Sequence, residues 1–170
     1  MQAGNLPIQG VLQGNGMGPF IWALISTMLL TCMKSMGFLA HLTGVLTGTT
    51  LAFVGYAFVN DTDVCFTAQN NHTPATDILP ECQEGVDFWQ GTLVTTGGGL
   101  EHRDNKTFWH LIDHKWTGHK WEYHTAQDSP GEISIQMTDS DERATLCRKE
   151  ANEASETLGI FIAMDGNWDG

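Results

Sequence analysis

The sequence predicts an α+β fold in which two helices pack against an antiparallel sheet. Apolar residues recur at helical spacing in two segments, whereas other segments combine β-branched and aromatic residues with turn signals. The predicted elements follow the order helix, hairpin, helix, hairpin, strand, and no internal repeat interrupts that order. With 170 residues, of which 41% are hydrophobic, the chain is long and apolar enough to form one domain of ordinary size.

The first helix is predicted to begin at Gly18 and to end near Met36. Pro19 suits the first helical turn, because its φ angle is already fixed and its missing N–H would have no partner there. Gly37 is typical of the position just beyond a helix. The segment is apolar apart from one narrow stripe, which predicts a mostly buried helix. The stripe consists of Ser26, Thr27, Thr31, Lys34 and Ser35.

A β-hairpin is predicted over residues 50–66. Residues 50–59 are mostly apolar, β-branched or aromatic, and the pattern breaks at Asn60-Asp61 before it resumes at Asp63. Two such runs joined by turn-forming residues are typical of a hairpin with a polar tip.

The rest of the chain predicts four further segments. A helix over 80–96 follows Pro80 and ends before Gly97. A second hairpin covers 108–124 and turns at residues 117–120, a short strand is expected near 133–137, and a last strand covers 157–163.

Charge is distributed unevenly along the chain. Residues 1–59 hold one charged residue, Lys34, whereas the chain from Asn60 onward holds all 20 acids and seven bases. The resulting net charge of −12 argues against an autonomous nucleic-acid-binding domain, because neutralising phosphates requires a basic face.

The apolar runs do not predict a membrane protein. Residues 20–33 are too few for a span of about 20 residues, and residues 42–59 are rich in glycine and threonine and lack basic flanks. No basic segment precedes them as in a signal peptide, and the four cysteines are widely spaced. We therefore expect an intracellular protein, in the nucleus or cytoplasm, with reduced thiols and no membrane partner.

The tip of the first hairpin carries the sharpest chemical signal. Asn60, Asp61 and Asp63 crowd onto an otherwise hydrophobic hairpin, where like charges repel unless a cation compensates them. Oxygen ligands held on rigid strands are typical of a magnesium site. A solvated turn is the simpler alternative on the pattern alone, because Asn and Asp favour turns.

Four segments resemble, in order, the conserved blocks of reverse transcriptases. The run VGYAFVNDTDVCF (54–66) resembles the aromatic-x-Asp-Asp hairpin of that family. Leu12-Gln13-Gly14 followed by Gly18-Pro19 resembles its Gln-Gly-x-x-x-Ser-Pro block, with glycine in place of serine. Gly99-Leu100 with Lys106-Thr107 resembles the Gly-Leu…Lys-Ser/Thr block, and ETLGI (156–160) resembles the last palm strand.

The resemblance covers residues 12–162 and implies the palm and part of the fingers of an RNA-directed DNA polymerase of the retrotransposon or group II intron type. Such enzymes use two Mg²⁺ ions for nucleotidyl transfer, and their partners are an RNA template, a DNA primer and deoxynucleotides. The implied catalytic positions are Asn60, Asp61 and Lys106, with Lys106 near the triphosphate. Asp61 and Asp63 are the implied metal ligands. Gln13, Gly14 and Pro19 are the implied substrate- and template-binding residues.

Two departures from the family pattern weaken the implied chemistry. Asn60 stands where the family has its first hairpin aspartate, and a neutral amide binds metal less well than a carboxylate. A third carboxylate belongs before the Gln-Gly block, but the sequence MQAGNLPIQGVL holds no acid. We therefore expect a partial reverse transcriptase domain that is inactive in isolation. The alternatives are a degenerate retroelement remnant and, less favoured, an unrelated acidic metal-binding or membrane-associated protein.

Histidines and tryptophans in the second half suggest two further sites. Zinc binding by His110, His114, His119 and His124 is disfavoured, because His110 and His114 on one predicted strand would lie about 13 Å apart. Tryptophans can also stack on nucleic-acid bases, although sheet packing is their more frequent use. The candidates for stacking are Trp109, Trp116 and Trp121.

Overall fold

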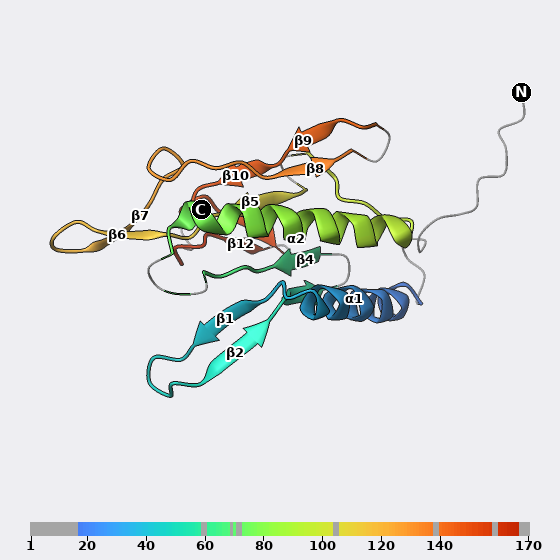
Figure 1. Cartoon of the computed structure of the whole chain (residues 1–170), viewed down its shortest axis with the longest axis horizontal. Helices are drawn as coiled ribbons and strands as arrows, with labels where there is room; N and C mark the ends of the chain where they lie inside the picture. The colour runs from blue at the N-terminus through green and yellow to red at the C-terminus, as the bar shows by residue number, and fades with distance from the viewer. Residues whose placement is uncertain are drawn as a thin grey trace, which may run out of the picture. The chain divides into compact units, whose positions relative to one another are not determined.

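The computed structural model describes residues 17–58, 61–68, 70, 73–103, 106–137, 140–157 and 160–166. Over these residues the chain forms two helices and twelve short strands, which confirms the predicted α+β class (Figure 1). It divides into two compact units: the described parts of Met1–Gln69 with Glu84–Leu100, and those of Asn70–Gln83 with Glu101–Gly170. None of the described helices is long and apolar enough to cross a membrane.

Helix α1 extends over Gly18–Ser35, as the sequence predicts. Pro19 lies in its first turn, and Gly37 follows it with a φ of 91°, a left-handed conformation that a residue with a Cβ avoids. Lys34 lies in the last turn, where a positive charge complements the helix dipole.

The expected polar stripe of α1 faces solvent at Thr27, Thr31, Lys34 and Ser35 but not at Ser26. Ser26 is buried, and its hydroxyl donates to the Ala23 carbonyl at 3.3 Å, so that the helix itself satisfies this polar group. A row of apolar residues on the same side of the helix as Thr27 and Thr31 is also more than half exposed, so the prediction of a mostly buried helix was wrong. That row consists of Phe20, Leu24 and Met28.

Helix α2 extends over Ala75–Thr95, five residues further toward the N-terminus than predicted. Pro80 therefore lies inside the helix, although its missing N–H makes it a natural helix start. The first part of α2, to Gln83, belongs to the second unit, and the part from Glu84 belongs to the first. Gln83 fixes the first part by a pair of hydrogen bonds to the backbone N–H and C=O of Ser134, at 2.9 and 2.8 Å.

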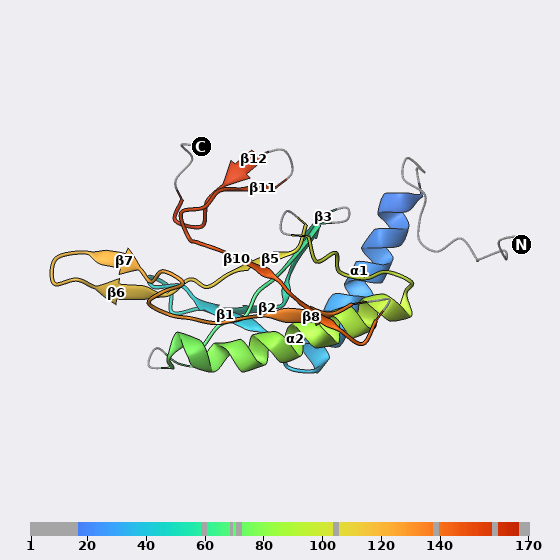
Figure 2. The ribbon, with the colours of Figure 1, turned by 90° about the horizontal axis from the view of Figure 1, so that it is seen from above.

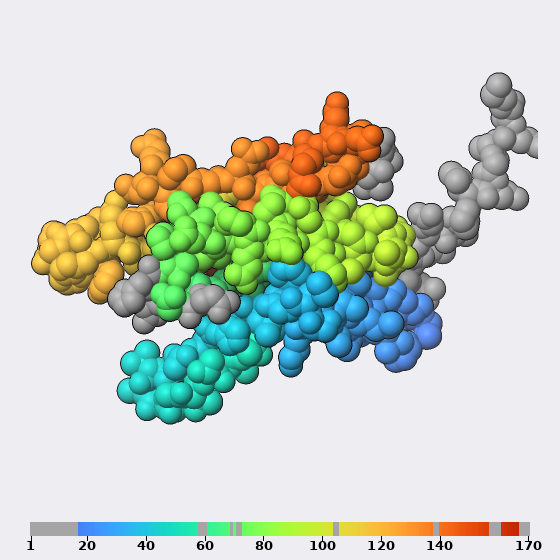
Figure 3. Space-filling model, in the orientation of Figure 1, coloured from blue at the N-terminus to red at the C-terminus, as the bar shows by residue number. Residues whose placement is uncertain are grey.

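The first unit contains two β-hairpins. Strands β1 (Ala40–Thr43) and β2 (Thr50–Phe53) pair antiparallel, and all residues from His41 to Ala52 are exposed (Figure 3). Strands β3 (Gly55–Phe58) and β4 (Asp61–Val64) form the second hairpin. The predicted continuous strand over 50–59 is thus divided at Val54, whose side chain is buried.

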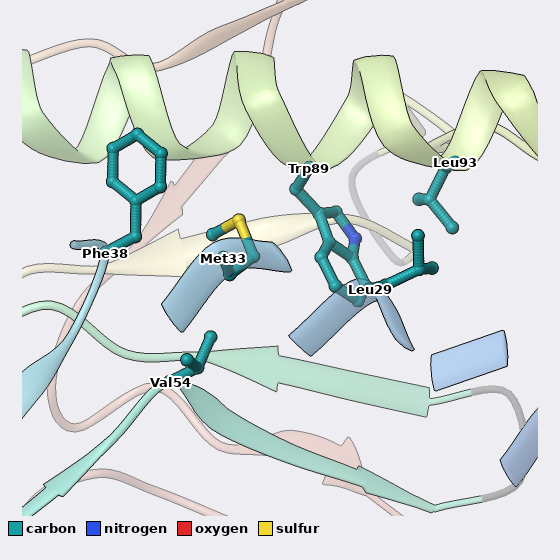
Figure 4. Close-up of a cluster of buried hydrophobic side chains, with 6 residues drawn as sticks. All are labelled: Leu29, Met33, Phe38, Val54, Trp89 and Leu93. Atoms are coloured by element: carbon teal, nitrogen blue, oxygen red, sulfur yellow. The ribbon is translucent and has the colours of Figure 1, made fainter. Parts of the chain in front are cut away.

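The core of the first unit lies between its helices and strands (Figure 4). Each helix contributes a pair of residues four positions apart, which places both side chains on one helix face. One residue after α1 and one between β2 and β3 complete the cluster. Its members are Leu29, Met33, Phe38, Val54, Trp89 and Leu93, all at most 6% exposed.

The second unit contains short paired strands. Three of its four described two-stranded sheets are antiparallel, and the fourth pairs β5 (Phe108–His110) parallel with β10 (Cys147–Lys149). The predicted hairpin over 108–124 is therefore shorter, and consists of β6 (His114–Trp116) and β7 (Trp121–Tyr123).

The remaining strands of the second unit also form hairpins. Strand β8 (Ser134–Gln136), the one predicted near 133–137, pairs with β9 (Arg143–Thr145). The predicted last strand is β12 (Ile160–Ile162), which pairs with β11 (Ser155–Thr157). Buried residues near these strands include Ile133, Ile135, Leu146 and Ala163.

Candidate functional site

The β3–β4 hairpin places two of the predicted site residues on one face. Asp61 faces Phe58 and Asp63 faces Tyr56 across the strand pair. Because side chains alternate along a strand, Asp61 and Asp63 point to the same side, about 6 to 7 Å apart along the chain. Asn60, in the connection between the strands, lies outside the described residues.

Tyr56 and Asp63 are electrostatically coupled. Partial burial, the neighbouring Asp63 charge and a hydrogen bond to its side chain together raise the pKa of Tyr56 to about 12. Burial, and then the Asp63 charge, also raises the pKa of the Cys65 thiol. The Asp63 carboxylate thus adds to the effect of burial on both neighbouring acids and disfavours their charged forms.

Gly55 allows the two strands to approach closely. A Cβ at this position would overlap the backbone carbonyl oxygen of Asp63, and it would lie 2.9 Å from the Cα of Val64. Because backbone atoms cannot rotate away as a side chain can, a larger residue at Gly55 would displace β4. The position of the Asp63 backbone thus depends on the glycine that directly precedes Tyr56.

The chemistry of the hairpin fits a hard cation in part. Asp61 is exposed and Asp63 is half-buried, so two carboxylates are accessible from one face. Magnesium prefers such oxygen ligands and retains several waters, so that one or two carboxylates from the protein suffice to hold it. Among the described residues no group of three or more histidine, cysteine or acidic side chains is placed to hold a metal.

The other predicted site residues belong to other segments of the sequence. Pro19 is exposed in the first turn of α1. Lys106 is exposed in a turn of the second unit, where its N–H donates to the Arg103 carbonyl at 2.8 Å. Gln13 and Gly14 lie outside the described residues.

The histidines and tryptophans that were considered as sites lie in different structural settings. His110 and His114 lie on different strands, β5 and β6, so the expected common strand was wrong. Trp109 donates its indole N–H to the Leu146 carbonyl at 3.3 Å and packs under the Arg148 guanidinium, so its role is structural. Trp116 and Trp121 are more than half exposed.

A histidine–carboxylate pair beside a small pocket was not predicted. The Nδ1 of His124 lies 2.6 Å from the Asp113 carboxylate, and the His124 N–H donates to the Asp113 carbonyl at 3.0 Å. Asp113 and His124 are the next opposed positions beyond the His114–Tyr123 pair of the β6–β7 hairpin. The register of that hairpin was therefore the signal in the sequence that could have predicted this contact. His124 lines a pocket of about 170 Å³, together with Tyr123, Thr125, Glu150, Ala151 and Asn152.

The pair orients the imidazole of His124. A carboxylate at Nδ1 favours the tautomer that carries its proton there, which leaves Nε2 as an acceptor. Glu150, which also lines the pocket, accepts a hydrogen bond from the Ala126 N–H at 2.9 Å and is thereby held in place.

Comparison with known proteins identifies no relative of this chain. No family model matches the chain, and no curated protein or solved structure is significantly similar to it.

Proposed function

We propose that this chain is a partial reverse transcriptase domain, with a polymerase-like palm and part of the fingers. The observation that carries the proposal is the β3–β4 hairpin, in which an aromatic strand leads to a two-residue connection and then to Asp61 and Asp63 on one strand face. The ordered resemblance of the three other sequence blocks supports it. In the complete enzyme the reaction is RNA-directed addition of deoxynucleotides to a DNA primer.

The roles of the residues follow from their chemistry. Asp61 and Asp63 would hold magnesium, which when bound stabilises negative charge on the attacking and leaving oxygens. Lys106 carries an exposed ammonium that suits binding of a triphosphate. The hydroxyl of Tyr56 hydrogen-bonds the Asp63 side chain and would help to orient its carboxylate.

Asn60 supports a second candidate function, that of an inactive remnant of such an enzyme. An amide at the position of a metal-bridging carboxylate weakens the attraction for two cations. If this costs even about 4 kcal/mol of transition-state stabilisation, the rate falls roughly a thousandfold.

Primer extension distinguishes these candidates. We expect the 170-residue chain to extend no primer with either Mg²⁺ or Mn²⁺. We expect Asn60→Asp, in a longer polypeptide that adds a strand with the third carboxylate, to gain Mg²⁺-dependent extension. Asp61→Asn in the same polypeptide is the matched control and should remove that gain.

Metal titration tests the site without catalysis. Relative to the unsubstituted protein, Asn60→Asp should bind Mg²⁺ more tightly in a calorimetric titration, and Asp61→Asn should bind it more weakly. Equal magnesium affinity in all three proteins would contradict the proposed metal site, and an inert Asn60→Asp polypeptide that binds metal would favour the inactive remnant.

A further inference from the structure

The β6–β7 hairpin exposes a pair of tryptophans at its tip. Trp116 and Trp121 face each other across the strands, with ring centroids 5.5 Å apart and ring planes inclined by 59°. The hairpin extends as a two-stranded ribbon in two perpendicular views (Figures 1 and 2). The rings are inclined rather than stacked, and the two residues are 55% and 66% exposed.

Hydrogen bonds and a glycine define the turn between these tryptophans. Thr117 holds it by two hydrogen bonds to the Lys120 carbonyl, from its N–H at 3.0 Å and from its hydroxyl at 3.1 Å. Gly118 has a φ of 97°, which favours glycine. On the strands below, the rings of His114 and Tyr123 lie 4.5 Å apart, so a second aromatic pair supports the first.

The charge of this hairpin differs in sign from that of the rest of the chain. Residues 114–123 hold two lysines and one glutamate, a net charge of +1, which leaves −13 for the rest of the chain. The Lys120 ammonium lies 2.7 Å from the Glu122 carboxylate in an exposed ion pair. Such pairs are weak in water, so a phosphate can replace the carboxylate as the partner of Lys120.

The second lysine of the hairpin has a more specific partner. Lys115 contacts Asp128 at 2.8 Å, and this contact is the main cause that holds the pKa of the Asp128 carboxyl well below its ordinary value. Asp128 also accepts hydrogen bonds from the N–H and the hydroxyl of Thr125, both at 3.0 Å. Lys115 is thus held by Asp128, whereas His119 and Lys120 lie in the turn between the two tryptophans.

We propose that the tip of the β6–β7 hairpin binds single-stranded nucleic acid by stacking bases on Trp116 and Trp121. Exposed aromatic faces next to a cation are the elements with which proteins bind single strands without sequence preference. A strand would approach this tip rather than the acidic remainder of the chain, because its phosphates are repelled elsewhere. The proposal requires neither the metal nor the nucleotidyl transfer of the proposed function.

Fluorescence anisotropy with a labelled oligo(dT) or oligo(rU) of about ten nucleotides tests the proposal on the full chain. We expect Trp121→Ala and Trp116→Ala each to weaken binding roughly 5-fold to 100-fold, the usual range for loss of one stacking side chain. Phe161→Ala is the matched control, since Phe161 is an exposed aromatic residue (58%) on β12 of the same unit. It should leave the affinity unchanged.

Charge variants that keep both tryptophans test the proposal even if the alanine variants fail to fold. Glu122→Gln frees Lys120 and should tighten binding, whereas Lys120→Glu should weaken it. Both charge variants should bind the oligonucleotide more tightly at low salt than at high salt. The affinity of Glu122→Gln should depend more steeply on salt concentration than that of Lys120→Glu.

Three results would overturn the proposal: no binding of either oligonucleotide by the wild-type chain, equal affinity of the tryptophan variants and wild type, or an equal loss in Phe161→Ala. Because no metal or nucleotide is present in this assay, its result is independent of primer extension. A longer Asn60→Asp polypeptide that binds oligonucleotides but extends no primer would retain the hairpin proposal and count against the catalytic one.

Discussion

Asp63 acts on Tyr56 over the short distance between paired strands. We predict that Asp63→Asn lowers the pKa of Tyr56 part of the way back toward its ordinary value of 10, because the charge and the acceptor are lost while the burial, which is the largest cause, remains. Absorbance of the tyrosinate during alkaline titration measures this shift, in a Tyr123→Phe background so that one tyrosine reports.

Asp61→Asn is the control for this titration. Asp61 faces Phe58 rather than Tyr56, and it is not among the causes of the raised Tyr56 pKa. The same shift in both variants would show that Tyr56 responds to the general negative charge of the hairpin rather than to its cross-strand partner.

The raised pKa of Tyr56 also predicts the direction of an alkaline effect on stability. The folded value of about 12 exceeds the ordinary value of 10, so the unfolded chain loses the phenol proton first. The contribution to the free energy of unfolding is complete below about pH 10 and is lost as the pH rises through about 12. Because the Tyr56 side chain is largely exposed, this contribution is small.

Two glycines of helix α2 provide a matched pair at the scale of an element. A Cβ at Gly85 would overlap the ring of Phe66 and lie 3.3 Å from the ring of Phe38, whereas nothing lies within 4 Å of a Cβ at Gly91. Alanine favours a helix by about 1 kcal/mol over glycine at an open position. We therefore predict that Gly91→Ala raises the free energy of unfolding by up to about 1 kcal/mol.

Gly85→Ala should have the opposite sign. The same gain in helix propensity is outweighed by crowding against two half-buried or buried rings, and overpacking typically costs about 1–3 kcal/mol. Urea unfolding monitored by circular dichroism measures both variants. A stabilised Gly85→Ala protein would show that Phe66 rotates away from α2 without loss of packing.

The helices were the elements most readily predicted from the sequence. Pro19 and Gly37 define the ends of α1 through local backbone chemistry, and the prediction was accurate there. Burial of Ser26 could not be predicted, since it depends on which face the core occupies. The start of α2 at Ala75 was missed because Pro80 is tolerated inside the helix, against its local preference.

The strands were predicted less completely because their partners are distant in the sequence. The hairpin at Asp61 and Asp63 forms where the turn residues indicated it. The parallel pairing of Phe108–His110 with Cys147–Lys149 joins segments separated by more than 30 residues, and no local pattern encodes such a pair. The Asp113–His124 contact was likewise missed because its evidence lies in hairpin register, not in a motif.

At the scale of the whole chain, the net charge of −12 sets the response to salt. All 20 acids lie after residue 60, against seven bases in the same stretch, so like-charge repulsion opposes folding of that part. We predict that the melting temperature rises between low and physiological NaCl concentration, because the screening length falls to about 8 Å.

A neutral osmolyte at equal osmolality is the control for this measurement. It changes water activity without screening charge, so it should produce a smaller rise than NaCl over the same range. A melting temperature that falls with salt would mean that the ion pairs, such as Lys115–Asp128, contribute more than the repulsion does.

The interleaved composition of the two units has a consequence for biosynthesis. Chain segments leave the ribosome in order, yet Asn70–Gln83 belongs with residues made after Leu100, while Glu84–Leu100 completes the unit begun earlier. The first unit therefore cannot gain Trp89 and Leu93 until the opening part of its neighbour has already emerged. During that interval the part of α2 before Glu84 has emerged without the strands of its own unit. A translational pause after residue 100 would therefore give the first unit time to fold before the second unit is complete.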